Sequence, residues 1–278
     1  MTGRPAGPDD LTLTLENPRA ERVKKVAGLA GRSARSRAGQ FLVEGPQGVR
    51  EAVAYAPARV RDIYLTADAL ERHRDMVADA LVSGLWVHVG TEDVLKAMSA
   101  DAQGILAVVE TTGDSLDDVV AAGPRLVAVL SNVRDPGNAG TAIRVADAAG
   151  ADAVVLAGES VDITNPKVVR STAGSLFHLP IVRAPLDAAV EALRRAGVAV
   201  LAADGSGEAL LGEAGAAPDD LAGPTAWVFG NEAWGLTEDE LALADLVVRI
   251  PIYGRAESLN LATAASVCLY ASAQAHRG

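Results

Sequence analysis

The sequence has little cysteine, few aromatic residues and no long apolar run. A single cysteine, Cys268, among 278 residues excludes a disulfide scaffold. It lies in an apolar stretch, where we expect a small buried hydrophobe and not a nucleophile. Charges, glycine or proline interrupt every apolar run before it reaches the ~18 residues of a membrane helix, and the first residues, MTGRPAGPDD, lack a signal-peptide core. These absences predict a cytoplasmic protein without a membrane partner.

Recognisable metal and nucleotide signatures are also missing. The four histidines are scattered and do not have the spacing of metal ligands, so we expect no metal site. Neither G-x-G-x-x-G nor G-x-x-x-x-G-K-[ST] occurs. The missing G-x-G-x-x-G counts against a dinucleotide-binding oxidoreductase, which would otherwise be the default interpretation of alternating strands and helices.

Charge is unevenly distributed. The chain has 25 Lys and Arg against 36 Asp and Glu, a net charge of −11. Between residues 19 and 37, however, one acid, Glu21, stands against seven basic residues: Arg19, Arg22, Lys24, Lys25, Arg32, Arg35 and Arg37. Such a segment is either a solvated surface or an arm that contacts phosphates, and the pattern alone leaves both open.

The apolar and helical patterns alternate along two stretches of the chain. We expect a flexible tail and basic segment over residues 1–38, a small α/β domain over 39–110, an acidic linker over 111–124 and a larger α/β domain over 125–278. Continuous apolar strands such as residues 126–130 are typical of a buried parallel sheet. The fold class is therefore α/β in both domains.

Three segments of the larger domain follow apolar strands and are dense in polar and turn residues. They are SNVRDPGNAGTAIR (residues 131–144), FGNEAWGL (229–236) and VVRIPIYGRAESLNLATAASVCLYA (247–271). Ligands of open α/β sheets bind beyond the carboxyl ends of strands, which is where these segments lie. Each taken alone is also explained as a turn with a helix cap, Asn138 being the expected cap in the first.

Together the three segments resemble the three motifs of the SpoU-like RNA 2′-O-ribose methyltransferases (the TrmH family) of the SPOUT superfamily. The resemblance covers residues 126–276, including KVVRSTAGSLFHLP between the first two motifs. The segment QFLVEGPQGVREAV resembles the start of the small ribosomal-protein-like substrate-binding domain that is often fused ahead of this catalytic domain. The resemblance implies a deep trefoil knot, which alternation alone would not predict because knots are rare.

The family binds S-adenosylmethionine through main-chain groups of the knot. The matching positions here are Gly230, Ile250 and Leu259, which the resemblance therefore identifies as cofactor-binding. Methyl transfer from a sulfonium needs neither a metal nor a covalent enzyme intermediate.

The family's catalytic positions fall on Asn138, Arg144, Glu232, Ser258 and Asn260. Arg144 is the family's usual candidate for the base that deprotonates the ribose hydroxyl. Because a guanidinium does not readily give up a proton, we assign Arg144 to binding the target phosphate and stabilising the developing alkoxide. Asn138 and Glu232 would orient Arg144 or the ribose, and Ser258 and Asn260 would hold the nucleoside.

The resemblance implies RNA and a second copy of the chain as partners. We expect Arg32, Arg35, Arg37 and Arg144 to bind RNA. We also expect a homodimer in which the closing helix, LATAASVCLYASAQA, packs against its partner, because apolar residues occur on more than one face: Leu259, Leu261, Cys268 and Tyr270.

The substrate expected is 23S ribosomal RNA, because the small N-terminal domain favours it. A transfer RNA 2′-O-methyltransferase and a non-catalytic knotted RNA-binding protein remain alternatives. The presence of all five catalytic residues counts against the second alternative.

Overall fold

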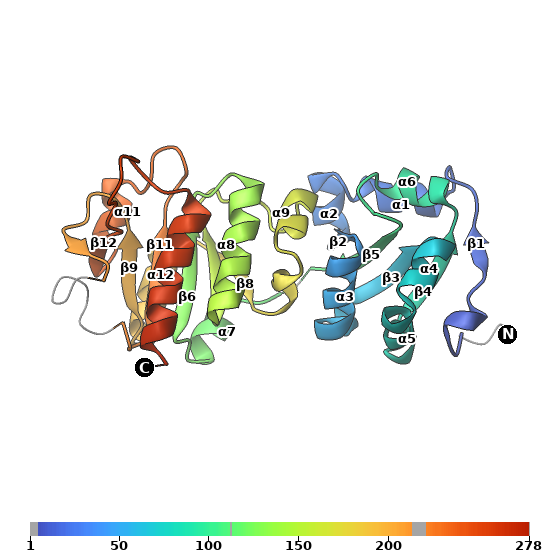
Figure 1. Ribbon diagram of the computed structural model, residues 1–278, viewed down its shortest axis with the longest axis horizontal. Coiled ribbons are helices and arrows are strands. Elements are labelled where there is room, and N and C mark those ends of the chain that lie inside the picture. Colours follow the sequence, from blue (N-terminus) through green and yellow to red (C-terminus); the bar gives the residue numbers. More distant parts are fainter. Residues whose placement is uncertain (1–4, 112, 213–220, 278) are drawn as a thin grey trace. The chain divides into compact units, whose positions relative to one another are not determined.

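The computed structural model describes residues 5–111, 113–212 and 221–277, and the chain divides into two units (Figure 1). The N-terminal unit contains residues 1–112 and 163–177, and the C-terminal unit contains residues 113–162 and 178–278. Residues 1–4 of the expected tail, residue 112 of the expected linker, and residues 213–220 and 278 of the expected larger domain lie outside the described residues. Both units are α/β, as the patterns predict.

The N-terminal unit is built on a mixed five-stranded sheet in the order β1-β4-β3-β5-β2. β4 pairs in parallel with β1 and β3, whereas β5 is antiparallel to β3 and β2. Its elements up to residue 110 are η1 (Pro8–Asp10), β1 (Leu13–Leu15), α1 (Glu21–Gly28), α2 (Arg32–Ala38), β2 (Gln40–Glu44), α3 (Pro46–Tyr55), η2 (Pro57–Arg59), β3 (Val60–Leu65), α4 (Ala67–Arg72), α5 (Arg74–Val82), β4 (Trp86–Gly90), α6 (Glu92–Met98) and β5 (Ile105–Glu110).

Residues 8–38 form regular elements of this unit, although we expected a flexible tail and a basic segment there. β1 extends the sheet by pairing with β4, and α1 packs on the core. Val23, Val26 and Leu29 recur every third residue, so they share one helix face and are all buried. The lysines between them face solvent. Charge dominated the sequence pattern, but the three apolar side chains decide the packing.

Residues 163–177, which lie between two strands of the larger domain in sequence, belong to the N-terminal unit. They contain α9 (Pro166–Ser171) and η3 (Ser175–Phe177). Arg170 forms an ion pair with Glu44, whose side chain is only 5% exposed, and a second with Asp101 at 3.0 Å. A buried carboxylate needs such a partner, so α9 is held by charge as well as by packing.

The C-terminal unit is built on a seven-stranded, all-parallel sheet in the order β10-β12-β9-β11-β6-β7-β8. Its elements are α7 (Leu116–Ala121), β6 (Leu126–Ser131), α8 (Pro136–Ala149), β7 (Ala153–Ala157), β8 (Ile181–Ala184), α10 (Leu186–Arg195), β9 (Ala199–Ala203), β10 (Ala209–Leu210), β11 (Thr225–Phe229), α11 (Glu238–Ala242), β12 (Leu246–Arg249) and α12 (Leu261–Ala275).

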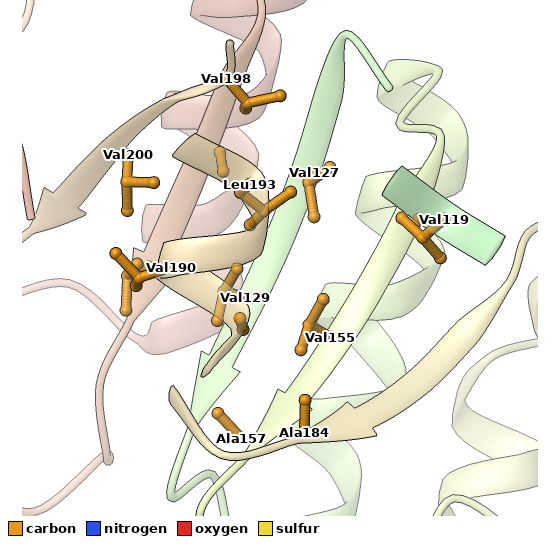
Figure 2. Packing of buried hydrophobic residues seen from close by; sticks show 14 of the residues in the cluster. Val119, Val127, Val129, Val155, Ala157, Ala184, Val190, Leu193, Val198 and Val200 are labelled. Atoms are coloured by element: carbon orange, nitrogen blue, oxygen red, sulfur yellow. The ribbon is translucent and has the colours of Figure 1, made fainter. Parts of the chain in front are cut away.

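One face of this sheet is covered by α7, α10 and α11. Figure 2 shows the buried cluster on this face, to which α7 contributes Val119 and α10 contributes Val190 and Leu193, together with side chains of the strands. The expected linker, residues 111–124, therefore contains a packed helix. Ser115 caps α7 and Asp118 completes the capping box, so the acidic residues that suggested a linker mark a helix start.

The other face is covered by α8 and α12. Ser272 of α12 accepts hydrogen bonds from Trp227 Nε1 at 2.9 Å and from the Thr225 hydroxyl at 3.0 Å. All three residues are buried, so these bonds satisfy polar groups that water cannot reach. They fix α12, whose N-terminus carries the third motif, against β11, which leads into the second.

Candidate active site

A cavity of about 850 Å³ opens in the C-terminal unit where β9, β11 and β12 end. Its lining includes residues 203–205, 229–233, 249–254 and 256–261. The three residues expected to bind the cofactor, Gly230, Ile250 and Leu259, all line it. The volume is within the range of small-molecule sites, and the position beyond the carboxyl ends of parallel strands is where such sites form.

Residues 231–235 form a tight hairpin on the rim of this cavity. Asn231 and Gly235 exchange two backbone hydrogen bonds, at 3.0 and 2.9 Å. A Cβ on Gly230 would lie 2.4 Å from the Gly235 carbonyl carbon. The resemblance identifies Gly230 as cofactor-binding through its main chain; in the structure the hairpin itself already requires a glycine there.

The buried side chain of Asn231 connects this hairpin to the loop after β6. Its Nδ2 donates to the Asn132 carbonyl at 2.7 Å, and its Oδ1 accepts from the Ala233 amide at 2.8 Å. Asn132 has a positive φ of 54°, a conformation that asparagine tolerates better than most residues. Sequence reasoning assigned neither asparagine a role, and the signal available was that asparagine is favoured in both turns and left-handed backbone.

Three predicted catalytic side chains meet in a hydrogen-bonded chain. Asn138 Nδ2 donates to Glu232 Oε1 at 3.2 Å, and Asn260 Nδ2 donates to Asn138 Oδ1 at 2.9 Å. One residue comes from each motif, so the chain joins all three. Asn138 is free to do this because Asp135 caps α8, accepting from the Asn138 amide at 2.7 Å. The expectation that Asn138 is the cap is therefore wrong. Asn260 caps α12 as well as bonding Asn138.

The two other predicted catalytic residues, Ser258 and Arg144, are not part of this hydrogen-bonded chain. Ser258 is exposed and lines the cavity. Arg144 lies on α8 six residues beyond Asn138, a rise of about 9 Å along the helix, and is exposed. Within the part of the chain that the structure describes, its guanidinium has no hydrogen bond or ion pair. It is thus available to a ligand but is not part of the Asn–Glu chain of this unit.

The three arginines of the basic segment that we expected to bind RNA lie in the N-terminal unit. Arg32 and Arg37 are exposed on α2. Arg35 is 4% exposed and donates to the carbonyls of Leu29 and Ala30 and to Thr164 Oγ1. Because these acceptors already hold its guanidinium, Arg35 organises the turn after α1 and the returning segment, and we leave it out of the set proposed to contact RNA.

Glu240 on α11 holds the loop after β6 through hydrogen bonds. Its Oε1 accepts from Ser131 Oγ at 2.5 Å and from Asn132 Nδ2 at 3.0 Å, and its Oε2 accepts from the Thr237 amide at 2.8 Å. Burial by itself raises the pKa of Glu240, but the hydrogen bonds from Ser131, Thr237 and Asn132 outweigh it and hold the pKa below its usual value. The ionised carboxylate therefore fixes the loop that carries Asn132.

Three further observations concern metal ligands, the single cysteine and membrane helices. Among residues 5–111, 113–212 and 221–277, no group of His, Cys, Asp and Glu could hold a metal ion. Cys268 is fully buried, and burial raises the pKa of its thiol to about 12, which confirms that it is a structural hydrophobe. No helix in the described part of the chain is long and apolar enough to cross a membrane.

Two family models match the chain. The SpoU rRNA Methylase family matches residues 125–270, and the MRM3-like substrate binding domain matches residues 20–107. The second match begins one residue before α1 and so includes the basic segment except Arg19.

Similar proteins cover nearly the whole chain. The 23S rRNA (guanosine(2553)-2′-O)-methyltransferase RlmP of Bacillus subtilis is 35% identical over 258 residues, which are 92% of this chain and 97% of the relative. The 23S rRNA (uridine(2479)-2′-O)-methyltransferase of Streptomyces viridochromogenes is 35% identical, covering 93% of this chain and 90% of the relative. The crystal structure of the SpoU methyltransferase AviRb of that organism, in complex with the cofactor AdoMet, has a TM-score of 0.78 at 33% identity, covering 92% and 98% of the two chains. These findings confirm the expected fold class of a SPOUT-type domain preceded by a smaller α/β unit.

The depressed pKa of Glu240 predicts a pH-dependent contribution to stability. A group whose pKa is lowered on folding stabilises the protein above its unfolded pKa, and this contribution is lost as pH falls through the folded pKa. Glu240→Gln should therefore lower the free energy of unfolding at pH 7, and the gap to wild type should persist down to about pH 4 and narrow only as the pH falls further. Urea unfolding at several pH values measures this. Glu238→Gln, on the same helix, is the control, and an equal loss at every pH would contradict the assignment.

Proposed function

The chain belongs to the SpoU rRNA methylase family, and we propose that it transfers a methyl group from S-adenosylmethionine to a ribose 2′-hydroxyl of 23S ribosomal RNA. The observation that carries this proposal is the joining of Asn138, Glu232 and Asn260 at the rim of a cofactor-sized cavity. The two relatives described above are named for 23S rRNA 2′-O-methylation, and the N-terminal match to a substrate-binding domain supports a ribosomal substrate. The reaction would take place in the cytoplasm, with ribosomal RNA.

The cavity suits S-adenosylmethionine in both chemistry and size. Backbone groups at Gly230 and Ile250 stand at strand ends, where amides and carbonyls can bind an adenine edge, and Leu259 and Leu210 supply apolar contact. When bound there, the cofactor supplies an electrophilic methyl group. The solved AviRb structure is described with AdoMet as its cofactor.

The protein's own residues would orient the ribose and stabilise its charge. Glu232 holds Asn138, and Asn260 donates to the same amide, so the Asn138 side chain is presented in one orientation at the cavity rim. Arg144 would bind the target phosphate and stabilise the developing alkoxide through its guanidinium. Ser258 would help to hold the nucleoside beside Asn260.

We further propose a homodimer formed through α12. Of the four apolar residues expected to mark two faces, Leu261 and Cys268 are buried in their own unit. Tyr270 and, beside it, Val267 are 42% and 40% exposed, and the Tyr270 hydroxyl donates to the Ala148 carbonyl of α8 at 3.3 Å. Exposed apolar side chains on α12, next to α8, are suited to two-fold packing. Arg144 is exposed on the same helix α8, so such a dimer would bring it near a partner subunit.

Cofactor binding should not need a metal. We expect S-adenosylhomocysteine to bind the purified protein in the presence of a chelator and to stabilise it by about 2.7 kcal/mol at a hundred times its Kd. Calorimetry and thermal unfolding measure the two effects, with NAD as the control ligand. The absence of binding at millimolar S-adenosylhomocysteine would argue against the proposal.

Arg144 and the basic segment should contribute to different steps. Arg144→Ala should lower turnover on 23S rRNA by about 100-fold or more while leaving cofactor affinity unchanged. Arg144→Lys should also have low turnover, because lysine lacks the planar fork of the guanidinium. Arg32→Gln with Arg37→Gln should instead weaken RNA binding and reduce its salt dependence by about 0.7–0.9 in slope per lost contact.

Methyl-transfer assays at saturating RNA and salt titrations of RNA affinity separate these effects. Wild-type turnover in Arg144→Ala would contradict its assignment, as would an equal loss of saturated turnover in the Arg32 and Arg37 variant.

The dimer can be tested with charge substitutions on α12. Val267→Glu with Tyr270→Glu should give monomers by light scattering at micromolar concentration, because two carboxylates cannot be buried in an apolar interface without a large free-energy cost. Val82→Glu is the control, since Val82 is 87% exposed in the N-terminal unit. A wild-type protein that is already monomeric would sink the proposed dimer.

A further inference from the structure

Trp234 is a large aromatic residue left half-exposed beside the candidate active site. Of the three tryptophans, Trp227 is fully buried, whereas Trp86 and Trp234 are 57% and 50% exposed. Trp234 belongs to the hairpin of residues 231–235, two residues after Glu232. Leaving so much apolar area in water is unfavourable, which makes the position of this side chain informative.

The Trp234 side chain is outside the cofactor cavity. Ala233 and Gly235 on either side line that cavity, and Trp234 does not. A bound cofactor would therefore meet the backbone of the hairpin and not the indole. Because the indole is half-exposed and does not line the cavity, it is accessible to RNA that binds at the rim.

The hairpin holds Trp234 in place before any ligand binds. The paired backbone hydrogen bonds between Asn231 and Gly235 close the turn around it. The Asn231 side chain is buried and ties the turn to Asn132 and Ala233. An aromatic ring on such a support loses little conformational entropy when it is used as a contact surface.

One cation lies over the ring. The Arg134 guanidinium carbon is 5.3 Å from the centroid of the Trp234 ring, and Arg134 is itself held by Glu159 at 2.7 Å. Trp234 Nε1 has no hydrogen-bond partner among the residues that the structure describes. The rim thus offers an aromatic surface, a free N–H donor and a neighbouring positive charge, which are the groups that bind unpaired nucleobases and their phosphates.

We propose that Trp234 stacks on the base of the nucleotide whose ribose is held at Asn138 and Glu232, and so positions its 2′-hydroxyl. Glu232 and Trp234 are two residues apart in the hairpin, so their Cα atoms lie at most about 7 Å apart, within the scale of one nucleotide. Trp234 and Glu232 can therefore contact the base and ribose of the same residue. Trp234 is a positioning residue, and its assignment rests on the proposed RNA methyl transfer.

The test compares Trp234→Ala and Trp234→Phe with wild type, using unmodified 23S rRNA transcript and S-adenosylmethionine labelled in its methyl group. We expect Trp234→Ala to lower kcat/KM by about 5- to 150-fold, the range for one lost base stack, and Trp234→Phe to retain most of it. Thermal unfolding and the affinity for S-adenosylhomocysteine should match wild type in both variants. Trp86→Ala, which removes an equally exposed indole from the other unit, should leave kcat unchanged.

A fluorescence measurement decides the proposal independently of turnover. With Trp86 replaced by phenylalanine, only buried Trp227 and exposed Trp234 contribute tryptophan emission. The part that comes from Trp234 is identified by its loss in Trp234→Phe, and the transcript should quench that part. Unchanged kcat/KM in Trp234→Ala, or an equal loss of S-adenosylhomocysteine affinity, would overturn the proposal. If wild type binds the transcript but transfers no methyl group, the proposed function fails; absent quenching would then overturn the stacking as well.

Discussion

The buried amide of Asn231 ties together the two loops from which the candidate site is built. Its Nδ2 donates to a backbone carbonyl of the loop after β6, and its Oδ1 accepts from a backbone amide of the loop after β11. An asparagine that is 6% exposed would be costly if either bond were missing, because its polar atoms have no access to water. With both bonds made, Asn138 and Glu232 are brought within hydrogen-bond distance across 94 residues of sequence.

The parallel sheet makes this convergence possible. Its strands all point the same way, so the segments after β6, β9, β11 and β12 emerge at one edge. Helices on both faces remove water from the strands, and the buried Trp227–Ser272 bond fixes α12 so that Asn260 reaches Asn138. The cavity and the polar chain are consequences of the same topology, one formed from backbone and apolar groups and the other from side-chain amides and a carboxylate.

Charge has a different role in each unit. In the N-terminal unit Arg35 and Arg170 are held by carbonyls and carboxylates, so two of its cations serve the fold. Arg32 and Arg37 stay exposed, as does Arg144 in the C-terminal unit. An acidic chain can therefore offer positive charge to RNA at the few positions where a guanidinium is exposed, even though Arg37 also donates to Ser33 Oγ at 3.5 Å.

The alternation of apolar runs was sufficient to predict an α/β fold with a parallel sheet, and the three motifs located the site at its carboxyl edge. Charge density was the weaker guide. It suggested a tail where Val23 and Val26 pack, a linker where Val119 packs, and an RNA contact at Arg35, which is buried. The pattern of charges along the sequence shows which side chains are polar. It does not show which hydrogen-bond acceptors the fold brings next to them.

Sequence by itself determined the class of fold and the residues available for chemistry, because strand periodicity and the spacing within a motif are local properties. Only the tertiary structure decided that Asp135 caps α8 and frees Asn138 for Glu232, that residues 163–177 join the N-terminal unit, and that Trp234 lies outside the cavity its neighbours line. Each of these depends on contacts between distant segments. Their free energies arise from burial and hydrogen bonding that exist only once the chain has folded.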